Sequence, residues 1–168
     1  MRLNLGTRAG NTLPELMFGA MLIAVFFATI FEVNAVCLRY ISAGKENIGA
    51  IEGVQDRLES FRSLNFSDLT DQTFMTTLLT SPANTSDLAK KVAETVTIKA
   101  YPVVSGGPTV TYTRAAGASV SPSVTASGGS LASVGVVRAD VQYDWTLTLG
   151  GRSRTELTST LIADGIKK

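Results

Sequence analysis

The sequence predicts an α+β protein in which a long N-terminal helix is followed by a small antiparallel sheet, with the second half of the helix packed on that sheet. Three observations predict this architecture. An uncharged apolar run covers residues 16–31. Apolar residues spaced three and four positions apart then continue to residue 64, as on one face of a helix. Alternation of apolar and polar residues over 137–149 indicates a half-buried strand.

The apolar run has the length and composition of a membrane-spanning helix. With Thr12 and Leu13 before it and 33–38 after it, the segment exceeds the roughly 20 residues that a bilayer span needs. It is apolar on every side, unlike the helix of a soluble domain, which has one apolar stripe. A cleaved secretory signal is disfavoured, because Glu15 stands where such a signal is basic. The side chains expected to face lipid or other helices are Leu16, Phe18, Met21, Ile23, Phe26, Phe27 and Phe31.

A short motif precedes the run. Residues 1–10 carry two arginines and no acidic residue, and residues 8–16 read RAGNTLPEL. This order resembles the N-terminus of type IV pilins and pseudopilins, whose precursors are cut after a glycine and then N-methylated while the apolar helix is kept. The resemblance implies cleavage after Gly10 by prepilin peptidase and methylation of Asn11, which replaces the more usual phenylalanine or methionine. It also implies that Thr12, Leu13 and Glu15 act in assembly.

Glu15 has a physical reading beside the resemblance. A carboxylate at the edge of the hydrocarbon is costly unless it has a partner. One interpretation is a helix N-terminal acid, stabilised by free amides and the helix dipole, with Pro14 in the first turn. The other follows from cleavage, which creates an amine at Asn11 one turn away. In a fibre, Glu15 of one subunit would then neutralise the amine of its neighbour, and the resemblance favours this second interpretation.

The helix is predicted to continue past the run to about residue 64, a length of about 75 Å. Within it, residues 11–35 are expected to form the transmembrane and assembly half and 36–65 the amphipathic half. Charged residues, among them Lys45, Glu46 and Arg57, are placed on a solvated face. The apolar stripe is assigned to Val36, Tyr40, Ile41, Gly44, Ile48, Ile51, Val54, Leu58, Phe61 and Leu64.

Residues 66–168 are predicted to form a globular β domain. A loop and short helix over 67–80 is expected to have Ser67 as its cap. Strands are expected over 94–104, where Pro102 should end the pairing or lie at a sheet edge, and over 109–113. Residues 115–135 are expected to form either a weak strand around 120–124 set in loops or a single long loop.

The clearest prediction is a C-terminal hairpin over 137–163. Its residues 145–154 read WTLTLGGRSR, a W-x-x-x-x-G-G-R-x-R pattern that resembles the C-terminal hairpin of minor pilins and minor pseudopilins. Trp145 is expected in the core. A three-residue loop, 149–151, is chosen because it pairs Trp145 with Thr155 and Tyr143 with Leu157, and a slip of one residue would reverse every side chain. The solvated face would then carry Arg138, Asp140, Asp144, Arg152, Arg154 and Glu156.

Composition limits the chemistry. The 168 residues include no histidine and one cysteine, Cys37, which excludes histidine bases and zinc sites built on several His or Cys ligands. Asp140, Asp144 and Glu156 could bind Ca²⁺ or form an acid–base pair, but interleaved arginines favour an ordinary solvated face. We therefore expect a protein that is not an enzyme, with no catalytic residue, metal or cofactor. A net charge of +1 gives no signal for nucleic acid.

The resemblance implies a structural subunit, a minor pilin or minor pseudopilin, of a type IV pilus or a type II secretion pseudopilus. Its implied partners are other subunits, prepilin peptidase, the inner-membrane assembly platform and, before assembly, membrane lipid. The implied topology is a single pass of the inner membrane with a cytoplasmic N-terminus, since flanking positive charges are balanced and do not decide it. The alternative is a membrane-anchored, surface-exposed binding domain that does not polymerise and that contacts a ligand through its solvated face.

Overall fold

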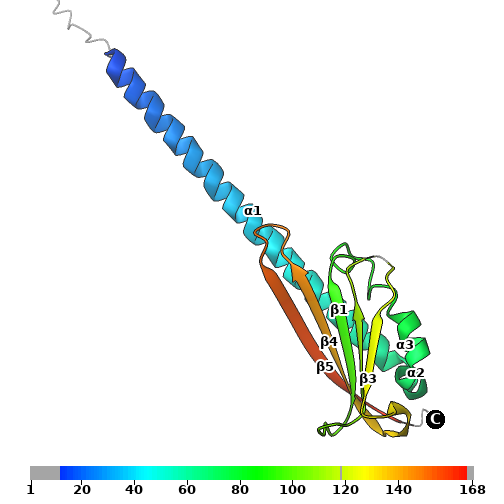
Figure 1. Ribbon diagram of the computed structural model, residues 1–168. Helices are drawn as coiled ribbons and strands as arrows, with labels where there is room; N and C mark the ends of the chain where they lie inside the picture. Colours follow the sequence, from blue (N-terminus) through cyan, green and yellow to red (C-terminus); the bar gives the residue numbers. More distant parts are fainter. Residues whose placement is uncertain (1–11, 118, 166–168) are drawn as a thin grey trace, which may run out of the picture. The chain divides into compact units, whose positions relative to one another are not determined.

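The protein consists of a long helix, α1 (Leu13–Ser63), followed by short helices and a five-stranded antiparallel sheet (Figure 1). This is a computed structural model, and it describes residues 12–117 and 119–165. The predicted α+β class is confirmed. The chain divides into two compact units, Met1–Ile41 and Ser42–Lys168, with the boundary inside α1. We refer to residues 13–41 as the apolar segment of α1 and to residues 42–63 as its packed segment.

The sheet has the strand order β3 (Ser123–Ser127), β2 (Thr109–Arg114), β1 (Ala93–Ala100), β4 (Val136–Thr146) and β5 (Ser153–Ala163), and every neighbouring pair is antiparallel. Strand β2 lies where it was expected, β1 ends four residues earlier than predicted, and β3 begins three residues later than predicted. The other elements after α1 are α2 (Phe66–Thr70), α3 (Gln72–Leu78) and the 3₁₀ turn η1 (Leu131–Ser133).

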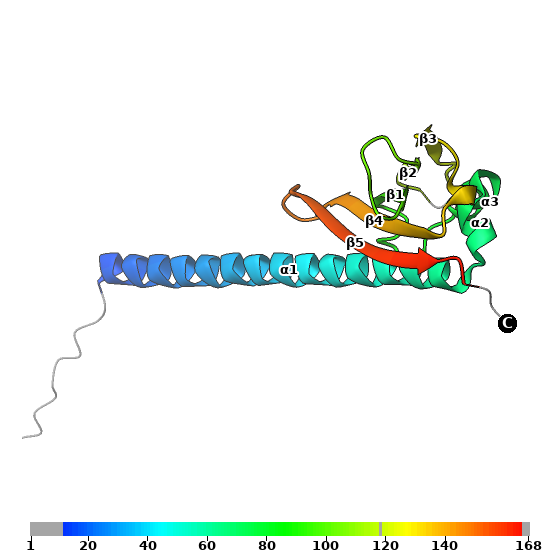
Figure 2. The same cartoon turned by 90° about the horizontal axis from the view of Figure 1, so that it is seen from below.

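The packed segment lies against one face of the sheet (Figure 2). Its buried apolar side chains recur at helical spacing and meet the inward side chains of β1 and β4 in one core. The predicted stripe is partly wrong, because Ile48 and Ile51 are exposed while Ala50 and Gly53 are buried. The members of the core include Ala50, Val54, Leu58, Phe61, Val96, Ile98, Val137, Ala139, Val141, Tyr143 and Trp145.

A small residue explains why the buried face of the helix differs from the predicted stripe. Tyr143 lies directly on Gly53, where an added Cβ would stand 2.7 Å from the Cε2 atom of the ring. The Tyr143 hydroxyl also donates a hydrogen bond to the Gly53 carbonyl oxygen (3.3 Å). Close approach of helix and sheet therefore requires glycine at this position. The fit between Gly53 and Tyr143 thus determines which face of the helix is buried, and Ile48 and Ile51 are left exposed.

The short helices start differently from the prediction. Ser67 lies inside α2, which is preceded by Asn65 without a side-chain capping bond. The side chain that caps is Asp71, whose carboxylate accepts a hydrogen bond from the Thr73 amide (2.8 Å) at the start of α3. Two short helices thus replace the single one expected, because the backbone breaks at Asp71, which is extended (φ −83°, ψ 114°).

The predicted register of the C-terminal hairpin is wrong by one residue. Trp145 pairs with Arg154 and Tyr143 with Glu156, and the ladder ends at Thr146 and Ser153. Beyond the ladder, the Leu147 amide donates to the Arg152 carbonyl (2.9 Å) and the Gly151 amide donates to the Leu147 carbonyl (3.3 Å). The turn therefore comprises residues 148–151, and both of its glycines adopt positive φ (102° and 62°), which is easy only for glycine.

This shift reverses the two faces of β5. Leu157 and Leu161 stand opposite Gln142 and Arg138 on the outer face, and both are more than half exposed. Arg154 and Glu156, which were predicted on the solvated face, instead lie on the side of α1, where Thr160 accepts a hydrogen bond from Arg62 (3.1 Å). Because β5 is an edge strand, its inner face tolerates polar side chains beside the helix.

Candidate functional site

The apolar segment is the first candidate site. Its helix is long and apolar enough to cross a membrane, with a mean hydropathy of 2.3 over the most apolar window. Between residues 13 and 41 no side chain is buried, and only Gly19 is half-buried. The predicted contact residues Leu16, Phe18, Met21, Ile23, Phe26, Phe27 and Phe31 are 53–70% exposed. An apolar surface of this extent needs lipid or another protein to cover it.

The first turn of α1 positions Glu15. The Thr12 carbonyl accepts hydrogen bonds from the Glu15 amide (2.9 Å) and the Leu16 amide (3.2 Å), so the helix begins at Leu13 with Pro14 in its first turn. Glu15 therefore lies in the first turn of α1, where the positive end of the helix dipole favours an acid. Gly10 and Asn11 lie outside the described residues, and the pairing of Glu15 with a new amine stays a prediction.

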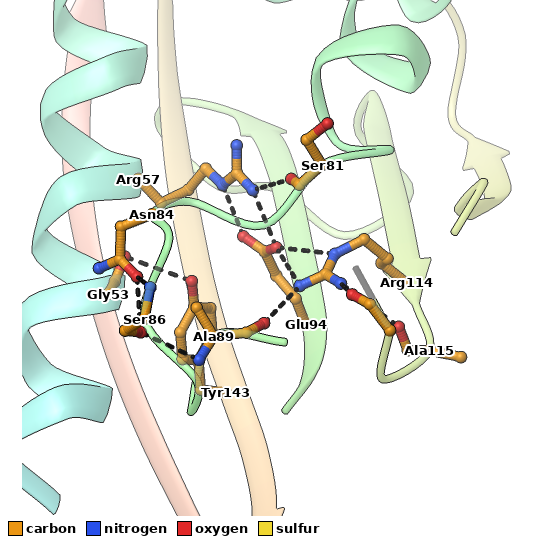
Figure 3. A network of polar contacts seen from close by, with 11 residues as sticks. Gly53, Arg57, Ser81, Asn84, Ser86, Ala89, Glu94, Arg114, Ala115 and Tyr143 are labelled. Atoms are coloured by element: carbon orange, nitrogen blue, oxygen red, sulfur yellow. Dashed lines mark hydrogen bonds and ion pairs between the residues drawn. The ribbon is translucent and has the colours of Figure 1, made fainter. Parts of the chain in front are cut away.

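Three charged side chains in the second unit form a buried cluster (Figure 3). Glu94 on β1 accepts hydrogen bonds from Arg57 of α1 (2.7 and 3.0 Å) and from Arg114 of β2 (3.2 Å). All three are at most 3% exposed. The guanidinium groups also donate to backbone carbonyls, those of Ser81, Ala89, Ala115 and Gly117. The cluster therefore fixes the loop before β1 and the end of β2, and it corrects the placement of Arg57 on a solvated face.

The sequence contains a pattern that indicates this cluster, although the prediction from the sequence placed Arg57 on a solvated face. Glu94 has the same parity as the buried Val96 and Ile98, and Arg114 has the same parity as Val110 and Tyr112. Arg57 follows Val54 by three positions and precedes Phe61 by four, which places it on the buried face. Charged residues in phase with apolar neighbours on three elements thus indicate a buried ion pair.

Two tyrosines of the core resist ionisation. Burial, reinforced by the nearby Asp71 carboxylate, raises the pKa of Tyr112 to about 12. Burial, reinforced by Glu94, raises the pKa of Tyr143 above its ordinary value. Both side chains are therefore neutral at physiological pH, and neither is poised for proton transfer.

The predicted carboxylate group is not brought together. Asp140 is bound by Lys99 (3.2 Å) and Arg138 (2.6 Å), and Asp144 accepts hydrogen bonds from Gln142 and Thr155. Glu156 lies on the opposite face of the sheet. In the part of the chain that the structure describes, no three His, Cys, Asp or Glu side chains gather as metal ligands. Asp140 is itself buried (9% exposed) against its two cations, and Arg154 lies with Glu156 on the other face, so the predicted solvated face is wrong for these three residues.

Trp145 is buried in the core as predicted, with 7% of its surface exposed. Its indole N–H has no hydrogen-bond partner among residues 12–117 and 119–165. Cys37 lies exposed in the apolar segment.

Comparison of the chain with family models, curated proteins and solved structures found no match. Functional interpretation therefore depends on the N-terminal motif and on geometry. The geometry offers no assembled set of catalytic groups within the described residues. Its most prominent feature is the uncovered apolar segment with an acidic residue in its first turn.

Proposed function

We propose that this chain is a structural subunit of a helical fibre, a minor pilin or minor pseudopilin of a type IV pilus or a type II secretion pseudopilus. It is processed after Gly10 by prepilin peptidase and assembled through the apolar segment. Before assembly it spans the inner membrane once, with a cytoplasmic N-terminus and the second unit outside the cytoplasm. Its partners are other subunits and the assembly platform of the inner membrane.

The observation that carries the proposal is the contrast in coverage along α1. The second unit buries its own apolar residues in a core, whereas the apolar segment buries none of its own. Covering a large aliphatic or aromatic side chain is worth about 1.5–3 kcal/mol. Membrane lipid can supply this before assembly, and the apolar helices of neighbouring subunits can supply it afterwards.

Glu15 supports assembly over simple anchoring. A membrane anchor needs no acid in its first turn, and a carboxylate there raises the cost of insertion. In a fibre of packed helices the acid has a binding partner, because the amine created by cleavage supplies the counter-charge of Glu15 in a water-poor interior. The motif that precedes Glu15 places that amine at Asn11.

Replacement of Glu15 separates the two roles. We expect Glu15→Ala and the isosteric Glu15→Gln to insert into the membrane normally but to be lost from sheared or pelleted fibres. Glu59→Ala, which alters an exposed acid in the packed segment, is the matched control and should assemble normally. Normal incorporation of both Glu15 variants would contradict the role given to this residue.

Imaging of the sheared material then distinguishes long surface fibres from a short periplasmic structure. If the chain is recovered in membranes but never in any fibre, the alternative of a membrane-anchored binding domain is favoured. In that case its outer sheet face, with Asp140 and its two cationic partners, becomes the surface to test for ligands.

A further inference from the structure

The apolar segment contains a second acid whose position the proposed function does not explain. Glu32 follows the uncharged run directly, and Arg39 is the first basic residue after Thr12. Both side chains are exposed. Among the described residues neither side chain makes a hydrogen bond or an ion pair. The five salt bridges between described residues all lie in the second unit. An unpaired carboxylate next to hydrocarbon is costly.

Glu32 cannot find a counter-charge on its own helix. On a helical surface the neighbours of a residue are three and four positions away, and those of Glu32 are Ala28, Thr29, Ala35 and Val36. Arg39 lies seven positions on, which places it within about 20° of the same side of the helix but about 10 Å farther along the axis. The partner that fits is therefore on another helix.

The surroundings of the two charges permit another helix to approach closely. Ala28 and Ala35 flank Glu32 on its side of α1, four positions before it and three after it, and both are exposed. Small residues at such positions allow helix backbones to come near one another in apolar surroundings. The face thus alternates small residues with one acid and one base, a pattern that is complementary to itself.

We propose that Glu32 of one copy pairs with Arg39 of a neighbouring parallel copy that is displaced by two helical turns. Where copies of this chain are neighbours, each uses Glu32 toward one copy and Arg39 toward another, so the contact is head-to-tail and does not close on itself. The ion pair fixes the axial offset between neighbours at about 10 Å. This inference rests on the proposed function, since it requires packed parallel copies, and it names what sets their register.

Cysteine cross-linking tests the offset. In a Cys37→Ser background, the double variant Glu32→Cys/Arg39→Cys should form a ladder of disulfide-linked multimers in assembled material. Two positions seven residues apart in one helix are too distant for a disulfide within one chain, so every cross-link joins two copies. The single variants Glu32→Cys and Arg39→Cys should give no cross-link, and Glu32→Cys/Tyr40→Cys, with the second position turned away, should give far less. Efficient cross-linking of Glu32→Cys alone would overturn the two-turn offset.

Charge exchange tests the pair without cysteines. Glu32→Gln or Arg39→Gln should lower the assembled fraction by about tenfold or more, because the remaining charge is buried alone. The exchanged variant Glu32→Arg/Arg39→Glu should recover most of the assembly. Assembly of Glu32→Gln at the level of the unmodified chain, or failure of the exchange to recover more than the single variants, would overturn the pairing. If the unmodified chain itself forms no fibre, the proposed function fails instead, so the two failures are distinct.

Discussion

The two parts of α1 belong to one helix yet use their apolar residues for different purposes. The packed segment buries six residues, among them Arg57, against its own sheet, and the apolar segment buries none. Hydrophobicity does not explain the difference, because the more apolar part is the one left uncovered. What distinguishes the packed segment is complementarity, in which Gly53 leaves room for the Tyr143 ring of the sheet and Arg57 meets a buried acid.

The comparison shows that burial within one chain requires a matching surface, and that apolar residues without one are available to partners. On this account, mutations in the packed segment change the stability of the second unit, and mutations in the apolar segment change insertion or assembly. Trp145 is the only tryptophan and lies in the core of the second unit, so its fluorescence reports unfolding of that unit alone.

The largest contrast is expected between two phenylalanines of α1. Phe61 is fully buried and Phe26 is mostly exposed. Phe61→Ala should lower the free energy of unfolding by about 3–5 kcal/mol, because it leaves a cavity in the core. Phe26→Ala should leave it unchanged within about 0.5 kcal/mol. Urea unfolding of the full chain in detergent, followed by Trp145 fluorescence, measures both, and equal effects would break the comparison.

The buried ion cluster should be nearly as sensitive. Glu94→Ala leaves the guanidinium groups of Arg57 and Arg114 without a counter-charge in the core, and the expected loss is about 3–5 kcal/mol. Glu59→Ala on the exposed side of the packed segment is the control, with an expected change of less than about 0.5 kcal/mol. An equally mild effect of both variants would show that the cluster does not hold the loop before β1 in place.

Two glycines of the packed segment should respond with opposite signs. Gly53→Ala places a methyl group against Tyr143 and should destabilise the unit by about 1–3 kcal/mol. A Cβ at Gly44 meets nothing within 4 Å, so Gly44→Ala should stabilise the helix by up to about 1 kcal/mol. Stabilisation by both substitutions would mean that the sheet does not approach the helix at Gly53.

The smallest contrast tests the hairpin register. Ile162 packs partly against the core and Leu161 points outward, so Ile162→Thr should cost about 1 kcal/mol and Leu161→Thr less than about 0.5 kcal/mol. The register predicted from the sequence places Leu161 inside and gives the reverse order. Unfolding midpoints of the two variants decide between them.

Much of the fold was predictable, because long periodic patterns leave few alternatives. The alternation over 137–149 gave β4 and its buried Trp145, and the apolar run followed by an amphipathic stripe gave α1. The register of β5 was not predictable, since its apolar residues have mixed parity, with Leu157 and Leu161 at odd positions and Ile162 at an even one. Turn length depended on backbone geometry at Gly150 and Gly151 that residue type alone does not reveal.

For the candidate site, the sequence identified the apolar segment, because length and composition determine it, whereas the contacts of its side chains stay a prediction. It missed the buried cluster, since Arg57, Glu94 and Arg114 come from three elements and the charge of each invited placement at the surface. The one indication of burial was their spacing from Val54, Val96 and Val110, which places each charged residue on the buried face of its helix or strand. The assembly roles of Gly10, Asn11 and Glu15 stay predictions from the N-terminal motif.

The mass of the N-terminal peptide of the mature chain tests the central claim most directly. We predict that material isolated from the membrane or from a fibre begins at Asn11, carries a methylated amine and retains the whole apolar segment. A chain that begins at Met1, or at Val36 after removal of the apolar run, would contradict the claim that this helix is kept to join subunits.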